Sequence, residues 1–479
     1  MDEYDIIVAG SGVSGSLAAA MASKLGSKVL LLDRNKEDEP GKKTLWGWVC
    51  GDAVAKSHIE FVKSNLGNIF RSESLGMPVD GVVALSPDLN FRIPFEGEGY
   101  SLERPEFGKD LHDAAIRNGA EFIPNFNVEA PIIEDGKVVG VEGKDKDGNI
   151  KKFSGKVIVD ALGISSLLRR KLPENIYIDR EIDYEDIELT GRYIYNLEEI
   201  DNDLRYYDPK YALIHLNQEL APGGYGWVFP KKGNRVNIGL GFQQKSLEIR
   251  NSKMNMKDNL KSLMDYYVKW NPALKKYSLD NNHGNGQGFW SVSVRRQMES
   301  MVFPGYIGVG DAMASPNPLS AGGIGPALIG GVIAGKVASE AVQRKDSSLE
   351  SLWQFNIEYN KQYGSKMAGL EIFRIFLQSL TNDEINYGMK NFITYEEAVE
   401  ISYGRVPELS LTSKITKLVK GVGSMRSFKN LVWSVDRMKE LNGIYNNYPK
   451  TPADFPKFKA KVQSIINEAK ARMPPNPVA

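Results

Sequence analysis

The sequence predicts a mixed fold, α/β in its first domain and α+β overall, with a parallel-sheet domain, an inserted antiparallel sheet and a C-terminal helical region. Three observations predict it. A strand, a glycine-rich turn, a helix and a second strand open the chain over residues 4–33. Short alternating strands rich in tyrosine and tryptophan occupy residues 175–285, and aromatic residues and leucines recur at helical spacing after residue 346.

We expect three domains, because 479 residues are too many for one hydrophobic core. The parallel-sheet domain should combine residues 1–80, 100–174 and 286–345. The inserted sheet domain should combine residues 81–99 and 175–285, and the helical domain should cover residues 346–479.

Composition excludes several classes of protein. The chain carries 60 Lys and Arg against 60 Asp and Glu, so no overall charge favours a nucleic-acid partner. Its single cysteine, Cys50, excludes an intramolecular disulfide and a cysteine-ligated zinc or iron–sulfur site, and we expect no metal. The lone thiol, the lack of a signal-peptide pattern and the lack of a run of about 18 apolar residues predict a cytoplasmic protein that does not span a membrane, although it could lie on the inner face of one.

The opening unit has the pattern of a Rossmann-like, dinucleotide-binding motif. An apolar strand over Ile6–Ala9 leads into G-x-G-x-x-G at residues 10–15, a small-residue helix over Leu17–Leu25 and a second strand that ends at Asp33. A carboxylate at this position accepts from a ribose hydroxyl, and Arg34 follows it. The order of all these parts favours a bound dinucleotide over the alternative, a glycine turn without a ligand.

Each glycine of the loop has its own role. Gly10 makes the tight turn, Gly12 lets the backbone approach a pyrophosphate, and Gly15 lets the helix pack on the strand. Val13 and Ser14 lie between the glycines, where free N–H groups and the positive end of the helix dipole favour a phosphate.

The next distinctive stretch is Thr44–Ala53. It places two tryptophans and a Cys50-Gly51-Asp52 turn close to the nucleotide loop. This indicates a functional loop, although a packed loop that only covers the first domain would also explain the composition.

Strands and one helix follow. Residues 81–95 alternate as paired strands, and Pro105 and Glu106 predict a helix that opens there and runs to Asn118. Arg104, just before this helix, can reach a phosphate or lie on the surface. Further strands are predicted over Glu121–Ile123, Asn127–Ile133, Val138–Gly143, Lys151–Phe153 and Lys156–Ala161. A turn with Asp160 and Gly163 ends the last of them.

The inserted sheet centres on an aromatic strand. Alternation puts Tyr225, Trp227 and Phe229 on one face, which can line a deep apolar slot or pack on a helix. Strands are predicted over Glu188–Tyr195, Tyr211–Asn217, Gly226–Phe229 and Val236–Phe242, with a helix over Met256–Lys269.

The chain then returns to the first domain. An apolar strand over Gly305–Val309 ends in Gly310-Asp311, and after a loop a second glycine-rich helix start, Gly322-Gly323-Ile324, runs to about Val342. The start of this helix offers free N–H groups to a negative group.

The C-terminal region is helical and basic. From Leu411 onward it has 13 Lys and Arg against 4 Asp and Glu, interleaved with aromatic and aliphatic residues. Such a segment can lie on an anionic lipid surface, or it can be the solvated face of an ordinary helical cap.

The glycine sites at residues 10–15, at Gly163 and at Gly322-Gly323 are more than a nicotinamide nucleotide needs. Together they resemble the glutathione-reductase-type FAD fold in its para-hydroxybenzoate-hydroxylase branch. The resemblance implies that FAD is the cofactor, with its pyrophosphate on the first loop and its adenosine ribose on Asp33. It also implies that Asp311 binds the ribityl and pyrophosphate region and that the helix at Gly322 points its dipole at the flavin N1–C2=O edge.

Within that branch, the stretches Trp48–Ala53, Tyr225–Pro230, Val236–Gly241 and Asp383–Lys390 resemble the archaeal geranylgeranyl reductases, over nearly the whole chain. The resemblance implies that the Y-x-W-x-F-P strand binds the substrate and that the cysteine loop faces the flavin. The residues so expected to contact FAD are Gly10, Gly12, Val13, Ser14, Gly15, Asp33, Arg34, Cys50, Gly51, Arg104, Val128, Asp160, Gly163, Gly310, Asp311, Gly322, Gly323 and Ile324. Those expected to contact the substrate are Tyr225, Trp227, Phe229 and Pro230.

The implied reaction saturates C=C bonds of a geranylgeranyl or other polyprenyl lipid. An unactivated alkene needs a proton on one carbon and a flavin hydride on the other, and aromatic faces can stabilise the developing positive charge. Cys50 and Tyr225 are the candidate proton donors. NADPH or ferredoxin is the expected electron donor.

Other readings stay open from the sequence. A flavin monooxygenase or halogenase of the same fold would consume oxygen, and an electron-transfer flavoprotein would exchange electrons with ferredoxin or a quinone. A lipid-binding protein without flavin is the third alternative.

Overall fold

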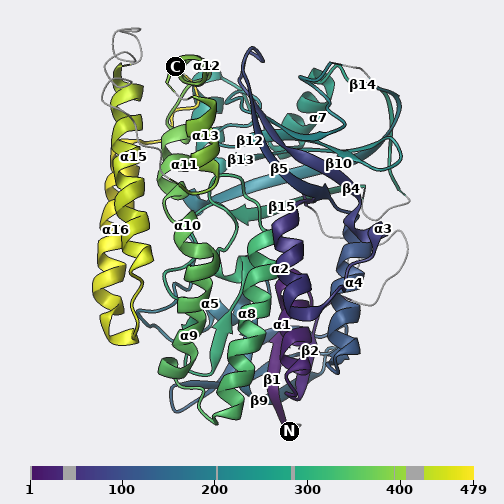
Figure 1. Cartoon of the computed structure of the whole chain (residues 1–479), viewed down its shortest axis with the longest axis vertical. Helices are drawn as coiled ribbons and strands as arrows, with labels where there is room; N and C mark the ends of the chain where they lie inside the picture. Colours follow the sequence, from purple (N-terminus) through teal and green to yellow (C-terminus); the bar gives the residue numbers. More distant parts are fainter. Residues whose placement is uncertain are drawn as a thin grey trace.

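The computed structural model describes residues 3–35, 50–200, 203–281, 286–392, 394–405 and 425–478. Two sheets and a helical region make up this part of the chain, which confirms the predicted fold class. Figure 1 shows the first sheet and its helices below, the second sheet above, and the last helices along one side. The domain boundaries stay a prediction.

The first sheet has a parallel centre. Over the described residues its strand order is β16-β17-β9-β1-β2-β6, with β8 paired to β9 and β7 to β8. β1 pairs in parallel with β2 and β9, and β17 pairs in parallel with β9, so the carboxyl ends of these strands lie at one edge. The strands are β1 Glu3–Ala9, β2 Val29–Leu32, β6 Glu121–Ile123, β7 Asn127–Glu134, β8 Lys137–Lys144, β9 Ile150–Asp160, β16 Val302–Phe303 and β17 Tyr306–Gly308.

Helices cover this sheet. α1 packs against both α8 and α4, and α8 also contacts β1 and β9. α1 and α8 are almost entirely buried, because their small residues allow close packing. The helices are α1 Val13–Lys24, α2 Lys56–Leu66, α3 Ser72–Leu75, α4 Arg104–Arg117, α5 Leu167–Arg170 and α8 Ile324–Gln343.

The second sheet runs β14-β10-β13-β12-β11-β4-β5-β3 over the described residues, with β15 also paired to β10. Its described pairs are antiparallel except β11 with β4, which are parallel. A parallel pair is possible here because a long stretch of chain separates the two strands. The elements are β3 Ala53–Ala55, β4 Met77–Leu85, β5 Arg92–Ser101, β10 Ile187–Ile200, β11 Tyr211–His215, β12 Tyr225–Lys231, β13 Arg235–Gln243, α6 Gln244–Met254, α7 Leu260–Trp270, β14 Leu274–Leu279 and β15 Gln287–Ser293.

The region after residue 346 is helical, as predicted. A π-helical turn, Asn360–Gly364, interrupts the helical stretch expected over Trp353–Leu380. The helices are α9 Leu349–Tyr359, α10 Ser365–Met367, α11 Leu370–Gln378, α12 Asn382–Asn391, α13 Tyr395–Ser402, α15 Met425–Asn446 and α16 Phe455–Arg472.

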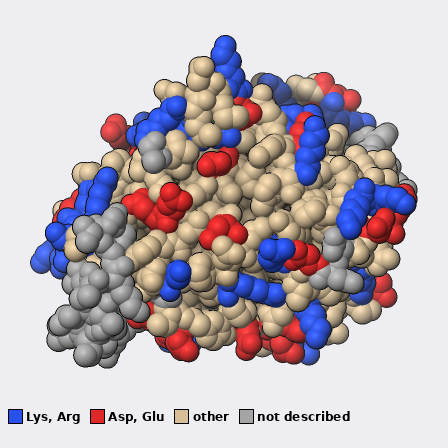
Figure 2. Space-filling model, turned by 90° about the horizontal axis from the view of Figure 1, so that it is seen from above, with Lys and Arg blue, Asp and Glu red and all other residues tan. Residues whose placement is uncertain are grey.

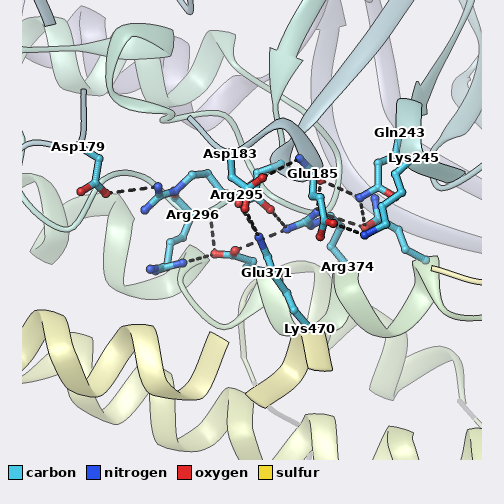
Figure 3. A network of polar contacts seen from close by, with 12 residues as sticks. Asp179, Asp183, Glu185, Gln243, Lys245, Arg295, Arg296, Glu371, Arg374 and Lys470 are labelled. Atoms are coloured by element: carbon cyan, nitrogen blue, oxygen red, sulfur yellow. Dashed lines mark hydrogen bonds and ion pairs between the residues drawn. The ribbon is translucent and has the colours of Figure 1, made fainter. Parts of the chain in front are cut away.

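An ion-pair network joins the second sheet to these helices (Figure 3). Arg374 of α11 pairs with Asp186 at 2.8 Å and with Glu371 at 3.5 Å, and Lys470 of α16 reaches Asp186 at 3.0 Å. Arg296 pairs with Glu371 at 2.6 Å. Removing one member would leave a buried charge uncompensated, so the network fixes α11 and α16 against the start of β10.

The distribution of charged side chains on the surface is relevant to the predicted contact with a membrane. Figure 2 shows acidic and basic side chains interspersed around uncharged residues on the face at the top of Figure 1. Among the described residues, no helix is both long and apolar enough to cross a membrane. Residues 411–424 of the basic segment, and Trp46, Trp48 and Val49 of the early loop, lie outside the described residues.

Several element boundaries differ from the prediction. The two strands expected over Lys151–Phe153 and Lys156–Ala161 form one strand, β9, because Ser154 and Gly155 pair with β1 and continue the ladder. The helix expected from Met256 begins at Leu260, where Asn259 caps it. Helix α6 was not predicted, because its apolar residues lack a clear helical period.

Candidate functional site

A cavity of about 740 Å³ lies where the predicted motifs meet. The nucleotide loop, the cysteine loop, strands β10 and β12 and the start of α8 all line it. Its volume is in the range of cofactor and ligand sites.

The nucleotide loop leaves an open cradle at one end of this cavity. Gly10 has φ +102°, and a Cβ there would lie 2.4 Å from the Ala161 carbonyl oxygen. A Cβ on Gly15 would lie 1.8 Å from the Gly10 carbonyl oxygen, so α1 can pack this closely only on glycine. By contrast, a Cβ on Gly12 would have no protein atom within 4 Å. The space in front of Gly12 therefore suits a group that approaches the backbone closely, such as a pyrophosphate.

Asp33 is held at the end of β2. Its Oδ2 accepts from the Ser11 N–H at 2.7 Å and its Oδ1 from the Asn35 N–H at 2.8 Å. Each carboxylate oxygen keeps a further lone pair, so the group can still accept from a ribose hydroxyl.

Arg104 brings buried donors to the cavity. The side chain begins α4 and is 6% exposed, yet its Nε and Nη1 have no hydrogen-bond partner among the described residues. Its nearest described carboxylate is Asp52, with Nε 3.9 Å from Oδ1. Buried guanidinium N–H groups that lack a hydrogen-bond acceptor fit a phosphate, which would supply the missing acceptors.

The start of α8 forms another part of the wall. Gly323 is the N-cap of α8 and, as a glycine, has no side chain that could accept a hydrogen bond. The N-cap therefore leaves the first N–H groups of the helix without a side-chain acceptor. Asp311 lies on the same cavity, and burial raises its pKa to about 6. His58 of α2 also lines it, and burial lowers its pKa to about 4, which keeps the ring neutral at pH 7.

The cysteine loop rests on the aromatic strand. A Cβ on Gly51 would lie 3.1 Å from the Phe229 ring, so the loop has no room for a larger residue there. Asn237 of β13 donates to the Cys50 carbonyl and to the Asp52 carboxylate, both at 2.8 Å. The Lys231 ammonium donates to the same carboxylate at 3.2 Å. These bonds fix the loop although nearly 190 residues separate its partners in sequence.

The aromatic face is a wall of the cavity. Tyr225, Trp227 and Phe229 all line it, which favours the slot over packing on a helix. The Trp227 indole N–H donates to Asn237 at 2.9 Å, and the Tyr225 hydroxyl donates to the Ser320 carbonyl in the loop before α8. The second bond ties the sheet to the start of α8. It also commits the Tyr225 proton to a backbone oxygen.

Most of the predicted residues lie on this cavity, but four do not line it. Gly15 packs α1, and Pro230 is buried in β12 next to Phe229. Asp160 accepts from the Tyr306 hydroxyl at 2.6 Å and from the Leu162 N–H at 3.0 Å, which holds the end of β9. Gly310 has φ +60° and lies against Ser14. The predicted residues that do line the cavity are Gly10, Gly12, Val13, Ser14, Asp33, Arg34, Cys50, Gly51, Arg104, Val128, Gly163, Asp311, Gly322, Gly323, Ile324, Tyr225, Trp227 and Phe229.

Sequence reasoning missed Glu188, Arg192 and Asn237. Glu188 and Arg192 lie on the cavity from β10, and both are buried. The sequence did contain a signal for Glu188 and Arg192, because polar residues at 188, 190 and 192 alternate along a strand and so share one face. The role of Asn237 depends on two long-range contacts and had no local signal.

Comparisons with known proteins match nearly the whole chain. A family described as geranylgeranyl reductase catalytic domain matches residues 186–275, and one described as FAD dependent oxidoreductase matches residues 5–210. The chain is 34% identical over 471 residues to a digeranylgeranylglycerophospholipid reductase from Sulfolobus acidocaldarius, covering 97% of this chain and 98% of that protein. It is 31% identical over 361 residues to digeranylgeranylglycerophospholipid reductase 1 of Methanopyrus kandleri, covering 75% and 87%.

Solved structures show the same fold. A geranylgeranyl bacteriochlorophyll reductase-like protein from Thermoplasma acidophilum has a TM-score of 0.71 at 24% identity, covering 92% of this chain and all of that one. The myxobacterial chondrochloren halogenase has a TM-score of 0.64 at 16% identity, covering 93% and 98%.

Proposed function

The chain belongs to the digeranylgeranylglycerophospholipid reductase family, and we propose that its substrate is a glycerophospholipid that carries two geranylgeranyl chains. It is an FAD-dependent oxidoreductase that saturates carbon–carbon double bonds of geranylgeranyl chains. The observation that carries the substrate proposal is the cavity in which an aromatic face and the nucleotide loop meet.

The aromatic face suits a long apolar chain. Trp227 and Phe229 are both 7% exposed, so a prenyl chain against them leaves water. Burial favours the chain by about 0.8 kcal/mol per CH₂ without fixing its register, so the chain can slide and present successive double bonds. The ring faces also stabilise positive charge that develops on the alkene.

The other residues of the cavity suit FAD. Gly12 and Arg104 would hold the diphosphate, Asp33 the ribose, and the start of α8 the electron-rich edge of the ring system. When bound, FAD supplies the hydride for the reduction. Around it, the Cys50-Gly51-Asp52 loop and Phe229 would exclude water from the reacting carbons.

The electron donor is NADPH or ferredoxin in our proposal. Anaerobic mixing of the oxidised holoenzyme with each donor, followed by flavin absorbance, tells the two apart. Bleaching by neither donor would refute this part of the proposal.

We also propose a peripheral membrane contact through the basic C-terminal region, because the substrate resides in a lipid bilayer and residues from Leu411 onward carry 13 Lys and Arg against 4 Asp and Glu. Flotation with anionic vesicles at low salt and release at high salt are the expected results. Equal binding to neutral vesicles would contradict the electrostatic basis.

The main test is product analysis. Dithionite-reduced holoenzyme is incubated with the digeranylgeranyl phospholipid, with geranylgeranyl diphosphate and with a prenylated quinone, and each product is analysed by mass spectrometry. We expect a gain of one H₂ per saturated bond, fastest for the phospholipid. Faster saturation of the quinone would refute the proposed phospholipid substrate. If no compound gained hydrogen, the proposed function would be refuted.

A further inference from the structure

One buried carboxyl on the cavity, that of Glu188, comes from neither the nucleotide loop nor the aromatic strand. Glu188 is the second residue of β10, is only 4% exposed and lines the cavity. Its backbone pairs with β13 and β15, but among the described residues its carboxyl makes no hydrogen bond and no ion pair. A buried acid that has no partner and faces a cavity is unusual, since burying a carboxyl without one is costly.

The sheet places Glu188 beside the aromatic face. Tyr225 of β12 and Thr190 of β10 are both register partners of Gly241 on β13. A Cβ on Gly241 would lie 3.2 Å from the Glu188 Oε2, so glycine at this position leaves the carboxyl its space. Glu188 lies two residues before Thr190, on the same face of β10, and so one same-face position along the sheet from Tyr225. The Tyr225 hydroxyl in turn reaches the loop before α8.

Burial, against the effect of the nearby charge, keeps about half of this acid protonated at pH 7. Burial raises the pKa of Glu188 to about 7, against a smaller lowering by Arg374 of α11. The Arg374 guanidinium is already engaged by Asp186 and Glu371 in the network of Figure 3. From β12 the facing group is the Tyr225 phenol, and on the same face of β10 the nearest cation is Arg192, four residues on.

The two proton donors expected from the sequence are weaker acids in this structure. Burial raises the pKa of the Cys50 thiol and, more strongly, that of the Tyr225 phenol. The Tyr225 proton is also donated to the Ser320 carbonyl. An acid with a pKa near the working pH transfers a proton best, which favours the carboxyl.

We propose that Glu188 is the catalytic acid that protonates the alkene carbon, an inference that rests on the proposed function. The Glu188 O–H bond breaks, and the alkene π electrons form a new C–H bond at the less substituted carbon. The more substituted carbon would accept the hydride that reduced FAD, held by the residues named above, would supply, and the flavin would be left oxidised. Glu188 is left as a carboxylate and takes up a proton from water before the next double bond.

The test compares Glu188→Gln with Glu248→Gln, which makes the same change at an exposed carboxyl of α6 bonded to the Tyr184 hydroxyl. In single turnovers of the dithionite-reduced holoenzyme, Glu188→Gln should saturate the prenyl chain at least about 100-fold more slowly, with FAD content and flavin reduction unchanged. Glu248→Gln should match the wild type. Glu188→Asp, which keeps an acid, should recover part of the rate. A wild-type rate in Glu188→Gln overturns the proposal.

Two further measurements exclude a merely structural role. The wild-type single-turnover rate should fall about tenfold per pH unit above about pH 7, and this fall should be absent from the residual rate of Glu188→Gln. Infrared difference spectra should show a protonated carboxyl that titrates near the same pH in the wild type and is missing in Glu188→Gln. A wild-type protein without this band also overturns the proposal. A wild type that binds FAD and shows the band but saturates no prenyl chain would instead refute the proposed function.

Discussion

Two glycines of the nucleotide loop, three residues apart, should respond to the same substitution in opposite ways. Gly12 has φ −76° and ψ −164°, which alanine adopts freely, and an added Cβ would have no protein atom within 4 Å. Gly12→Ala should therefore leave the apoprotein as stable as the wild type, or more stable by about 0.4–1 kcal/mol through the unfolded chain. The same methyl group would occupy the space that the pyrophosphate needs, so FAD affinity should fall at least about 100-fold, or about 2.8 kcal/mol.

Gly15→Ala should instead destabilise the protein itself. Its Cβ would lie 1.8 Å from the Gly10 carbonyl oxygen and 3.0 Å from the Ala161 Cβ, and both belong to packed backbone segments. Helix α1 would have to move away from β1, at a cost of about 1–3 kcal/mol or more.

Urea unfolding of the apoproteins and FAD titration by flavin fluorescence measure the two effects separately. Gly443→Ala is the matched control, since its Cβ also meets no atom within 4 Å and it lies in α15, away from the cavity. Unchanged FAD affinity in Gly12→Ala would show that the pyrophosphate does not lie on this loop. Unfolding of Gly15→Ala at the wild-type urea concentration would show that the α1 contact is not as close as the structure has it.

Three further outcomes are expected. Trp227→Ala should raise the KM for the prenyl substrate at least about tenfold and leave FAD affinity unchanged, because the ring buries the chain; equal effects on both would mean a general loss of packing. Cys50→Ala should keep FAD and at least half of the turnover, because the thiol is the weaker acid; a loss as large as that of Glu188→Gln would restore Cys50 as proton donor. Stability should also depend on pH through Glu188. Its folded pKa of about 7 is raised above the ordinary 4.5, because ionising the buried carboxyl costs stability; the fold is therefore least affected below pH 4.5 and loses stability as the pH rises from there through about 7. Urea unfolding at about pH 5 and about pH 8 should show the wild type losing about 2 kcal/mol relative to Glu188→Gln; a constant difference would mean that the carboxyl is not buried.

Local patterns predicted a large part of the fold and of the site. The spacing of Gly10, Gly12 and Gly15 requires a turn between a strand and a helix, and the structure has that turn. Alternation along β12 placed Tyr225 and Trp227 on one face, because successive side chains of a strand point to opposite sides. These features depend on neighbours in sequence, so the sequence alone carries them.

Element boundaries were harder to predict. β9 runs unbroken through Ser154 and Gly155 because β1 supplies hydrogen-bond partners there, and local propensity alone favours a break. Helix α6 forms without a clear apolar period and was missed for that reason.

A dinucleotide loop, a second helix start and an aromatic strand could all be predicted from the residue pattern, because each is a local matter of backbone conformation or side-chain alternation. That these three features share one cavity became visible with the packing of the two sheets. The same packing makes Asn237 the anchor of the cysteine loop and buries Glu188 beside Tyr225, without an ion-pair partner in the described chain. Burial and pairing depend on strands brought together from distant parts of the chain, and the acidity of a carboxyl follows from those surroundings.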